Sequence, residues 1–245
     1  MTDEDVSESK QTETEWLLQL RSQIDDIDQH LLALVKKRQQ LSAEVAQAKP
    51  KGSPIFRPGR EHSLLTRLSG LAESIPVPLV SALWRALMSA SITTQNPNFT
   101  VGYMMASAGA AAQFSAGMML LQQCDNAAAG CDALASGAVD IMLLDDKGLS
   151  EVLHRLGPDT SIYITAILPM VRSEGVPVSV WCLASSLPDR SAQDNAIFVE
   201  VKTGRIALIQ VSEYQDIPVH PNTAFIFAGY VAGTAFTTSI PVLAS

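Results

Sequence analysis

Apolar residues recur at helical spacing through the first part of the chain. From residue 13 to residue 49 there is no glycine or proline, and the apolar positions follow one another mostly at intervals of three and four: Leu17, Leu20, Ile24, Ile27, Leu31, Leu34, Leu41 and Val45. This period predicts one amphipathic helix, about 50 Å long at the usual helical rise. Such a helix exceeds what a compact domain of this size covers by itself, so it needs partner helices, from this chain or from another.

Two shorter helices are predicted to follow the first. "PKGSP" interrupts the pattern, helical spacing resumes over residues 61–71, and a third helix is expected from Pro78 to Gln95. "NPN" then ends the helical part, which we place at residues 13–97. The acidic, polar residues 1–12 are interpreted as a disordered tail.

After Asn98 the pattern changes to short β-rich runs separated by small-residue helices, which predicts an α/β domain over residues 98–245. Two of the runs flank "TG" and predict a hairpin. The chain is therefore expected to be a multi-domain protein, all-α and then α/β. The predicted strands are "FTVGYMM", "VDIMLLD", "SIYITAIL", "VSVWCLA", "AIFVEVK" and "RIALIQV".

Charge and composition exclude several classes of partner. The 245 residues are 47% apolar with a net charge of -8, and residues 101–245 hold 6 Lys and Arg against 13 Asp and Glu. No Lys or Arg occurs between Arg85 and Lys147, which argues against nucleic acid or an anionic membrane surface as partner. We expect no membrane span and no leader, and hence a cytoplasmic protein. The three cysteines lack metal or CxxC spacing and are expected to be buried thiols.

Against this acidic background, residues 48–68 gather five cations around one acid, Glu61. A solvated loop is one reading; a pocket for a small multi-carboxylate compound is the other. Arg38 and Lys49 are eleven residues apart and share a helix face, about 16 Å apart. Arg21 lies some 25 Å from Arg38 along the axis, so only an antiparallel partner helix could bring an Arg21 to the same ligand.

At these residues the sequence resembles the all-helical (AroQ-class) chorismate mutases, which are small intertwined dimers that convert chorismate to prephenate. The resemblance covers about residues 15–97 and is carried by "LRSQIDDIDQHLLALVKKRQQLSAEVAQAK", "RPGRE" and "LWRALMSASITTQ". It implies a homodimer in which the partner chain supplies Arg21. It also implies a role in the shikimate pathway, in the biosynthesis of the aromatic amino acids Phe and Tyr.

The resemblance also implies roles for individual residues. Arg38 and the Arg21 of the other chain would hold the substrate carboxylates, while Lys49 and Gln95 would contact the ether oxygen. Glu61, with the backbone near Arg57, would receive the substrate hydroxyl. Ser91 and Arg60 would line the carboxylate side. The position of Arg57 is acidic in some members of the family, so its assignment is the weakest of the set.

This chemistry agrees with the residue types present. A pericyclic rearrangement needs no nucleophile, metal or cofactor, and the four histidines form no visible group with a serine or cysteine. It needs cations that hold the flexible dianion in its reactive form and donors for the negative charge that builds on the ether oxygen. No metal and no cofactor are therefore expected.

The second domain faintly resembles the start of prephenate dehydratase, with "MASAGAA" and "LLDDKG" at the matching places. Ala196 and Ile197 stand where that enzyme's threonine and arginine would be. We interpret the domain as a degenerate ligand-binding or regulatory one, or as purely structural. For the whole chain, chorismate mutase is the leading hypothesis. The alternatives are an isochorismate pyruvate-lyase on the same scaffold, a bifunctional mutase and dehydratase, and a non-catalytic dimeric binding protein.

Overall fold

The computed structural model of the protein describes residues 3–50, 52–170, 180–187, 194–202, 205–211 and 224–232. The chain divides into two compact units, Met1–Lys49 and Pro50–Ser245. The first unit is helix α1 (Asp3–Ala48) and the second holds every other element.

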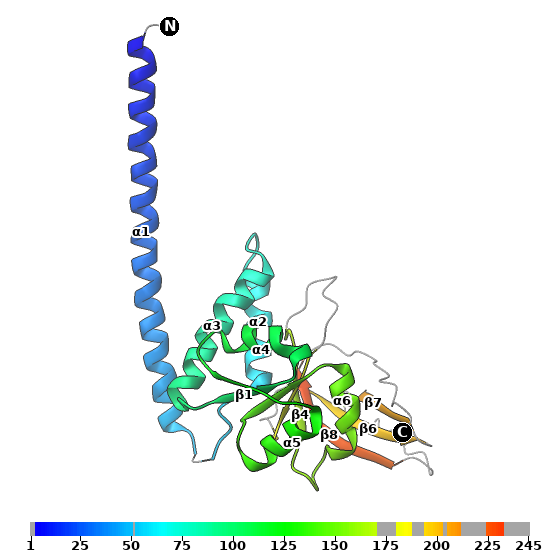
Figure 1. The fold of residues 1–245 in the computed structure, drawn as a ribbon. Helices are drawn as coiled ribbons and strands as arrows, with labels where there is room; N and C mark the ends of the chain where they lie inside the picture. Colours follow the sequence, from blue (N-terminus) through cyan, green and yellow to red (C-terminus); the bar gives the residue numbers. More distant parts are fainter. Residues whose placement is uncertain are drawn as a thin grey trace. The chain divides into compact units, whose positions relative to one another are not determined.

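Helix α1 is a single uninterrupted helix (Figure 1) that begins ten residues before the predicted start at residue 13. Most of the segment interpreted as a disordered tail is thus helical. Residues 3–12 contain no glycine or proline, and Glu, Lys and Gln among them have favourable helix propensities, so nothing local ends the helix. The apolar side chains that predicted the helix stay largely uncovered, with Leu31 53% and Leu34 64% exposed.

The next two helices, α2 (Pro58–Leu71) and α3 (Val77–Gln95), begin and end close to the predicted bounds. Both have a proline in the first turn, where the missing N–H costs nothing. Helix α3 ends because Asn96 is extended and precedes Pro97, which disfavours helical backbone at the residue before it.

The α/β part follows directly, and every predicted strand is present. Two strands, β2 and β8, were not predicted. The elements are β1 (Thr100–Tyr103), η1 (Met105–Ser107), α4 (Ala108–Ser115), β2 (Leu120–Gln123), α5 (Ala127–Ser136), β3 (Ile141–Leu144), α6 (Asp146–Val152), η2 (Leu153–Arg155), β4 (Tyr163–Leu168), β5 (Val180–Ala184), β6 (Asp194–Lys202), β7 (Arg205–Val211) and β8 (Ala224–Ala232).

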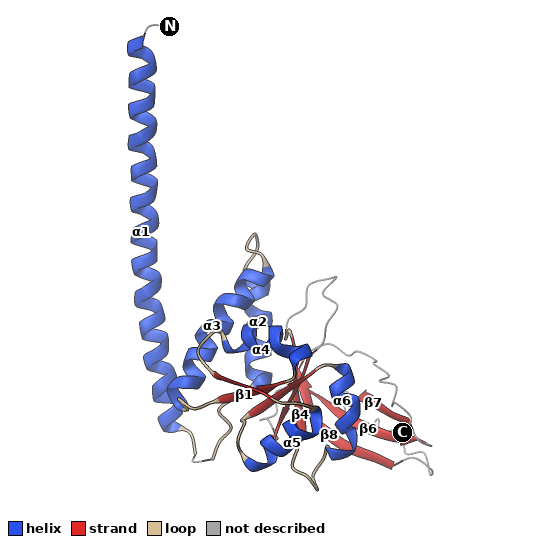
Figure 2. Cartoon of the chain, in the orientation of Figure 1, coloured by secondary structure: helices blue, strands red, loops and turns tan. Residues whose placement is uncertain are grey.

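The strands form one mixed sheet of eight, in the order β2-β1-β3-β5-β4-β8-β6-β7. Figure 2 draws the strands in red. Strand β1 pairs in parallel with β2 and β3, and β5 runs antiparallel between β3 and β4. The predicted hairpin is confirmed: β6 and β7 pair antiparallel from Ala196 and Val211 to Lys202 and Arg205. Gly229 of β8 pairs with Ile164 of β4. This close approach requires a glycine, because a Cβ at residue 229 would lie 2.0 Å from the carbonyl oxygen of Ile164.

Helices cover both faces of the sheet, and the side chains of β3 alternate between the two cores. Met142 and Leu144 pack with residues of α5 and α6 on one face. Ile141 and Leu143 pack with residues of α4 on the other. A strand buried on both faces reads as a continuous apolar run, which is why "IMLL" was recognisable in the sequence.

The pair of helices α2 and α3 belongs to the second unit because it is anchored on this second core. Ile92 of α3 and Phe56, just before α2, are both buried in it. Asp140, just before β3, fixes the passage from α3 to β1: its carboxylate accepts from the backbone N–H of Thr100 (2.7 Å) and from the Asn96 amide (3.4 Å). These helices therefore pack on the sheet.

Candidate active site

Three of the predicted substrate-binding cations lie in the first unit. Arg21 is exposed on α1, Arg38 is half-buried, and the half-buried Lys49 directly follows the last residue of the helix. Helix α1 runs without a break through Arg38 to Ala48, and Lys49 is the next residue. The common face of Arg38 and Lys49 stays a prediction.

The other five predicted residues lie in the second unit, on α2 and α3 or at their ends. Arg57 is the residue before α2 and is half-buried, whereas Arg60 is exposed in the first turn. Glu61 follows in the same turn, where a carboxylate is favoured by the helix dipole, and it is only 8% exposed.

Buried Glu61 is held by Arg85, which was not among the predicted site residues. The Arg85 guanidinium donates from Nη1 to Oε2 of Glu61 at 2.6 Å and from Nη2 to Oε1 at 3.4 Å. The side chains are 12% and 10% exposed, so the pair joins α3 to α2 out of reach of most solvent. A buried charge pair of this kind is tolerated only where both partners are well placed.

Arg85 also reaches the α/β domain. Its Nε donates to Ser89 Oγ at 3.2 Å, and that hydroxyl donates to the Phe114 carbonyl of α4 at 2.9 Å. The guanidinium carbon lies 4.4 Å from the centre of the Phe114 ring, a cation–π contact. One signal could have drawn attention to Arg85: it is the only charged residue between Glu73 and Asp125. A lone charge in an apolar helix requires a buried partner.

The two predicted residues of α3 are bonded to their own helix. The Ser91 hydroxyl donates to the Leu87 carbonyl at 2.9 Å, and Gln95 Nε2 donates to the Ser91 carbonyl at 3.0 Å. Gln95 is the last residue of α3 and is half-buried. A primary amide has two N–H donors, so the bond to Ser91 leaves Gln95 one for a ligand.

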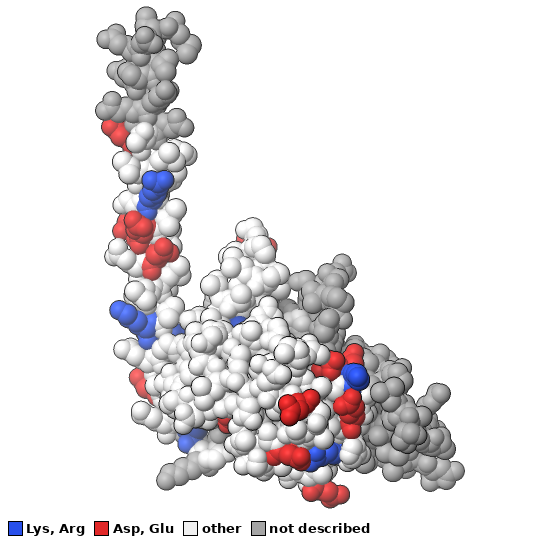
Figure 3. All heavy atoms as spheres, in the orientation of Figure 1, with Lys and Arg blue, Asp and Glu red and all other residues white. Residues whose placement is uncertain are grey.

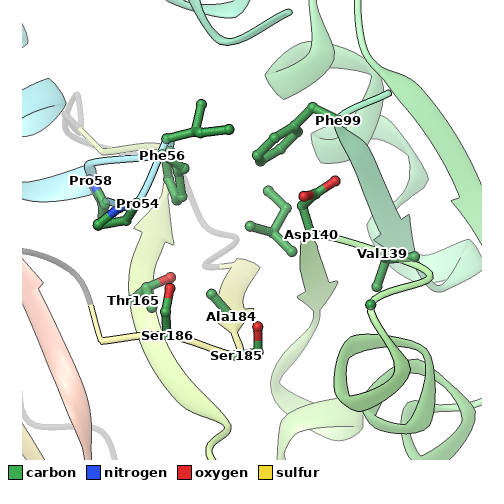
Figure 4. Close-up of a pocket in the computed structure, with 13 residues that line it drawn as sticks. Pro54, Phe56, Pro58, Phe99, Val139, Asp140, Thr165, Ala184, Ser185 and Ser186 are labelled. Atoms are coloured by element: carbon green, nitrogen blue, oxygen red, sulfur yellow. The ribbon is translucent and has the colours of Figure 1, made fainter. Parts of the chain in front are cut away.

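Two cavities border these elements in the second unit. One of about 180 Å³ lies between the segment before α2 and the sheet, with Phe56 on one side and Asp140 and Thr165 among its other lining residues (Figure 4). It is smaller than most ligand pockets. The other, of about 610 Å³, is lined by α2, α3, α4 and the end of β4.

The predicted site residues are mainly cationic, with one carboxylate (Glu61), one hydroxyl (Ser91) and one amide (Gln95). The face seen in Figure 3 is almost free of charged side chains over α3 and α4. The three cysteines are buried thiols, as predicted. Burial raises the pKa of each, that of Cys182 to about 12, so they are protonated at neutral pH and are poor nucleophiles. Within the part of the chain that the structure describes, no three His, Cys, Asp or Glu side chains gather as a metal site. In the same part, no helix is long and apolar enough to cross a membrane.

The predicted site residues thus lie in a helical region that is followed by an α/β region with a mixed sheet. Residues 20–96 match the family model of chorismate mutase type II, which confirms the resemblance carried by the motifs in this region. The matched residues take in most of α1 together with α2 and α3.

The chain is also 42% identical over 83 residues to the T-protein of Enterobacter agglomerans. That match covers 33% of this chain and 22% of the T-protein, so the matched part spans only about a fifth of that relative's length. A solved structure described as "GqqA- a novel type of quorum quenching acylases" aligns with 55% of this chain and 95% of its own, at 11% identity and a TM-score of 0.38.

Proposed function

We propose that this protein is a chorismate mutase that rearranges chorismate to prephenate in aromatic amino-acid biosynthesis. The observation that carries the proposal is the family match over residues 20–96, together with the presence of Arg21, Arg38, Lys49, Glu61, Ser91 and Gln95 at the motif positions. The decisive experiment is a direct assay of chorismate loss and prephenate formation. Isochorismate, assayed in parallel for pyruvate release, separates the mutase from the lyase alternative.

In this proposal the two arginines bind the substrate, and Lys49 and Gln95 stabilise the transition state. Arg38 and the Arg21 of a partner chain hold the two carboxylates in the geometry in which the breaking and forming bonds are aligned. Lys49 and the second N–H of Gln95 stabilise the charge that develops on the ether oxygen, an interaction that is strongest in the transition state.

Glu61 keeps room for its proposed contact with the substrate hydroxyl. A carboxylate has about four lone-pair positions, and Arg85 occupies two of them. The pair with Arg85 restrains the rotation of Glu61, which favours a fixed acceptor. Arg85 is in this sense a positioning residue, because it acts on the substrate only through Glu61.

We further propose that the protein is a homodimer formed along α1. The supporting observation is the row of apolar side chains on this helix, including Ile24, Ile27 and Leu34, each 56 to 64% exposed. A second copy of the chain offers the same row, and seams of leucine and isoleucine at this spacing pair helices.

A test of the shared site uses two inactive variants, Arg21→Ala and Arg38→Ala. In a symmetric dimer each site takes Arg38 from one chain and Arg21 from the other, so a mixed dimer has one intact site. An equal mixture after chain exchange should therefore recover about one quarter of the parental activity. Exchange is verified with differently tagged chains. If tagged heterodimers form and activity stays at the level of the single variants, each site is built within one chain.

The proposed role of Gln95 predicts a change in pH dependence. Gln95→Glu should lose about 10²-fold to 10³-fold in kcat/KM near neutral pH, because a carboxylate cannot donate to the ether oxygen and also faces the Ser91 carbonyl. Activity should recover as the pH falls and the carboxyl group takes up a proton. The measurement is kcat/KM from about pH 4.5 to 8.5.

The matched control is Gln95→Met, which has similar length and no N–H donor. It should lose activity at every pH, without the recovery in acid. If the parent, Gln95→Glu and Gln95→Met give the same dependence of kcat/KM on pH, Gln95 does not contact the ether oxygen.

For the α/β domain we propose a ligand-binding or regulatory role without dehydratase chemistry. The support is the sequence: Ala196 and Ile197 provide no catalytic group, and no Lys or Arg occurs over residues 101–146 to receive a dicarboxylate. Cytoplasmic localisation is part of the same proposal, because chorismate is a soluble intermediate of central biosynthesis.

A further inference from the structure

The larger cavity, of about 610 Å³, has the size of a small-molecule site. Its wall is mostly apolar and comes from four elements, with Leu65 of α2, Ala82 of α3, Gly109 and Phe114 of α4, and Leu168 at the end of β4. Part of the wall belongs to the segment "MASAGAA", which has no ionisable side chain. The cavity thus offers a ligand apolar surface from both the helical pair and the α/β domain.

One charged group, Arg85, borders this cavity, and its donors are not all used. A guanidinium has five N–H groups. Among the described residues Arg85 makes three hydrogen bonds, two to Glu61 and one to Ser89, which leaves two N–H groups without an acceptor. Unused donors on a largely buried arginine beside an apolar cavity are what a ligand acceptor would satisfy.

Charge selects the kind of acceptor. Glu61 already neutralises the charge of Arg85 at 2.6 Å. The attraction of a ligand carboxylate to Arg85 would therefore be offset by its repulsion from Glu61. A neutral carbonyl oxygen accepts from the guanidinium without that repulsion, and charged donors make the stronger hydrogen bonds. The apolar walls around Phe114 and Leu65 suit a ring-sized body.

We propose that this cavity is a binding site for a small, neutral, ring-bearing carbonyl compound, with Arg85 as the donor to its oxygen. The cavity shares Arg85 with the ion pair that holds Glu61, and its occupancy can be measured without mutase turnover. A ligand in this cavity would contact both the pair of helices α2 and α3 and the α/β domain.

The test is equilibrium dialysis of the full chain against 2-acetylnaphthalene, with 2-ethylnaphthalene as the probe of the same shape that lacks the acceptor. We expect the ketone to bind about tenfold more tightly, the factor for one hydrogen bond to a charged donor. Gly109→Leu, which places a side chain in the cavity, should weaken ketone binding at least about tenfold. A Cβ at Gly109 meets no atom within 4 Å, so the variant is expected to fold.

Gly70→Leu is the matched control, because Gly70 also lies in a helix with no atom within 4 Å of a Cβ, and it does not line the cavity. It should bind the ketone within about twofold of the parent. A second blocking variant, Ala82→Phe, fills the cavity from α3. The proposal is overturned if the parent binds no ketone up to its solubility limit, if both blocking variants bind as the parent does, or if the two probes bind equally. All these outcomes are independent of turnover, so they leave the proposed mutase function to its own assay.

Discussion

Lys49→Ala should reduce kcat/KM for chorismate by about 10²-fold to 10³-fold while leaving the fold intact. The lysine is proposed to face the ether oxygen as negative charge develops there, and losing one such donor in an enclosed site costs about 10²-fold to 10³-fold in rate. The measurement is steady-state turnover of chorismate, with far-UV circular dichroism and Tm to verify folding.

The control is Lys36→Ala, which removes an exposed lysine from the same helix. It should keep activity within about twofold of the parent, because an exposed lysine contributes little to binding or stability. Near-normal turnover of Lys49→Ala would exclude the proposed catalytic role of this residue. Equal losses in both variants would point to a general effect of charge on the helix.

Arg85→Ala should lower the free energy of unfolding by about 3 to 5 kcal/mol, because it leaves the carboxylate of Glu61 buried without its cation. The contacts of Arg85 with Ser89 and the Phe114 ring are lost as well. The measurement is urea unfolding followed by circular dichroism. The control is Arg67→Ala, an exposed arginine of α2, which should change stability by less than about 0.5 kcal/mol.

The double variant Glu61→Gln with Arg85→Met separates charge from packing. It removes both charges at similar volume, so it should be more stable than Arg85→Ala alone. A loss in Arg85→Ala no larger than that in Arg67→Ala would show that the pair is not buried in solution. The same double variant should lose mutase activity if Glu61 receives the substrate hydroxyl.

The helices and most strands could be predicted from the sequence because their signals are local. The three helices follow from the spacing of leucine and isoleucine and from the breaks at "PKGSP" and "NPN". Buried strands such as β3 and β5 are short apolar runs with every residue buried. Helix α1 begins before its predicted start because residues 3–12 contain no helix-breaking residue, and an acidic composition alone does not end a helix.

Two strands escaped prediction because their pairing is not local. The residues of β2 are all exposed, and it is an edge strand that exists by pairing with β1. Strand β8 is defined by its partners β4 and β6, which lie about 60 and 30 residues earlier in the chain. The spacing of apolar residues predicts which face of a segment is buried. It does not predict which strand that segment pairs with.

The sequence alone determined the succession of an all-α and an α/β region and the set of residues typical of a chorismate mutase, because periodicity and motifs depend on neighbours along the chain. Only the tertiary structure decided that α2 and α3 pack on the sheet through Phe56 and Ile92, and that Arg85 binds Glu61. It also showed the cavity beside Arg85. These features join residues that are 24 or more positions apart, and such contacts are selected by burial and by the cost of an unpaired charge, which no local pattern records.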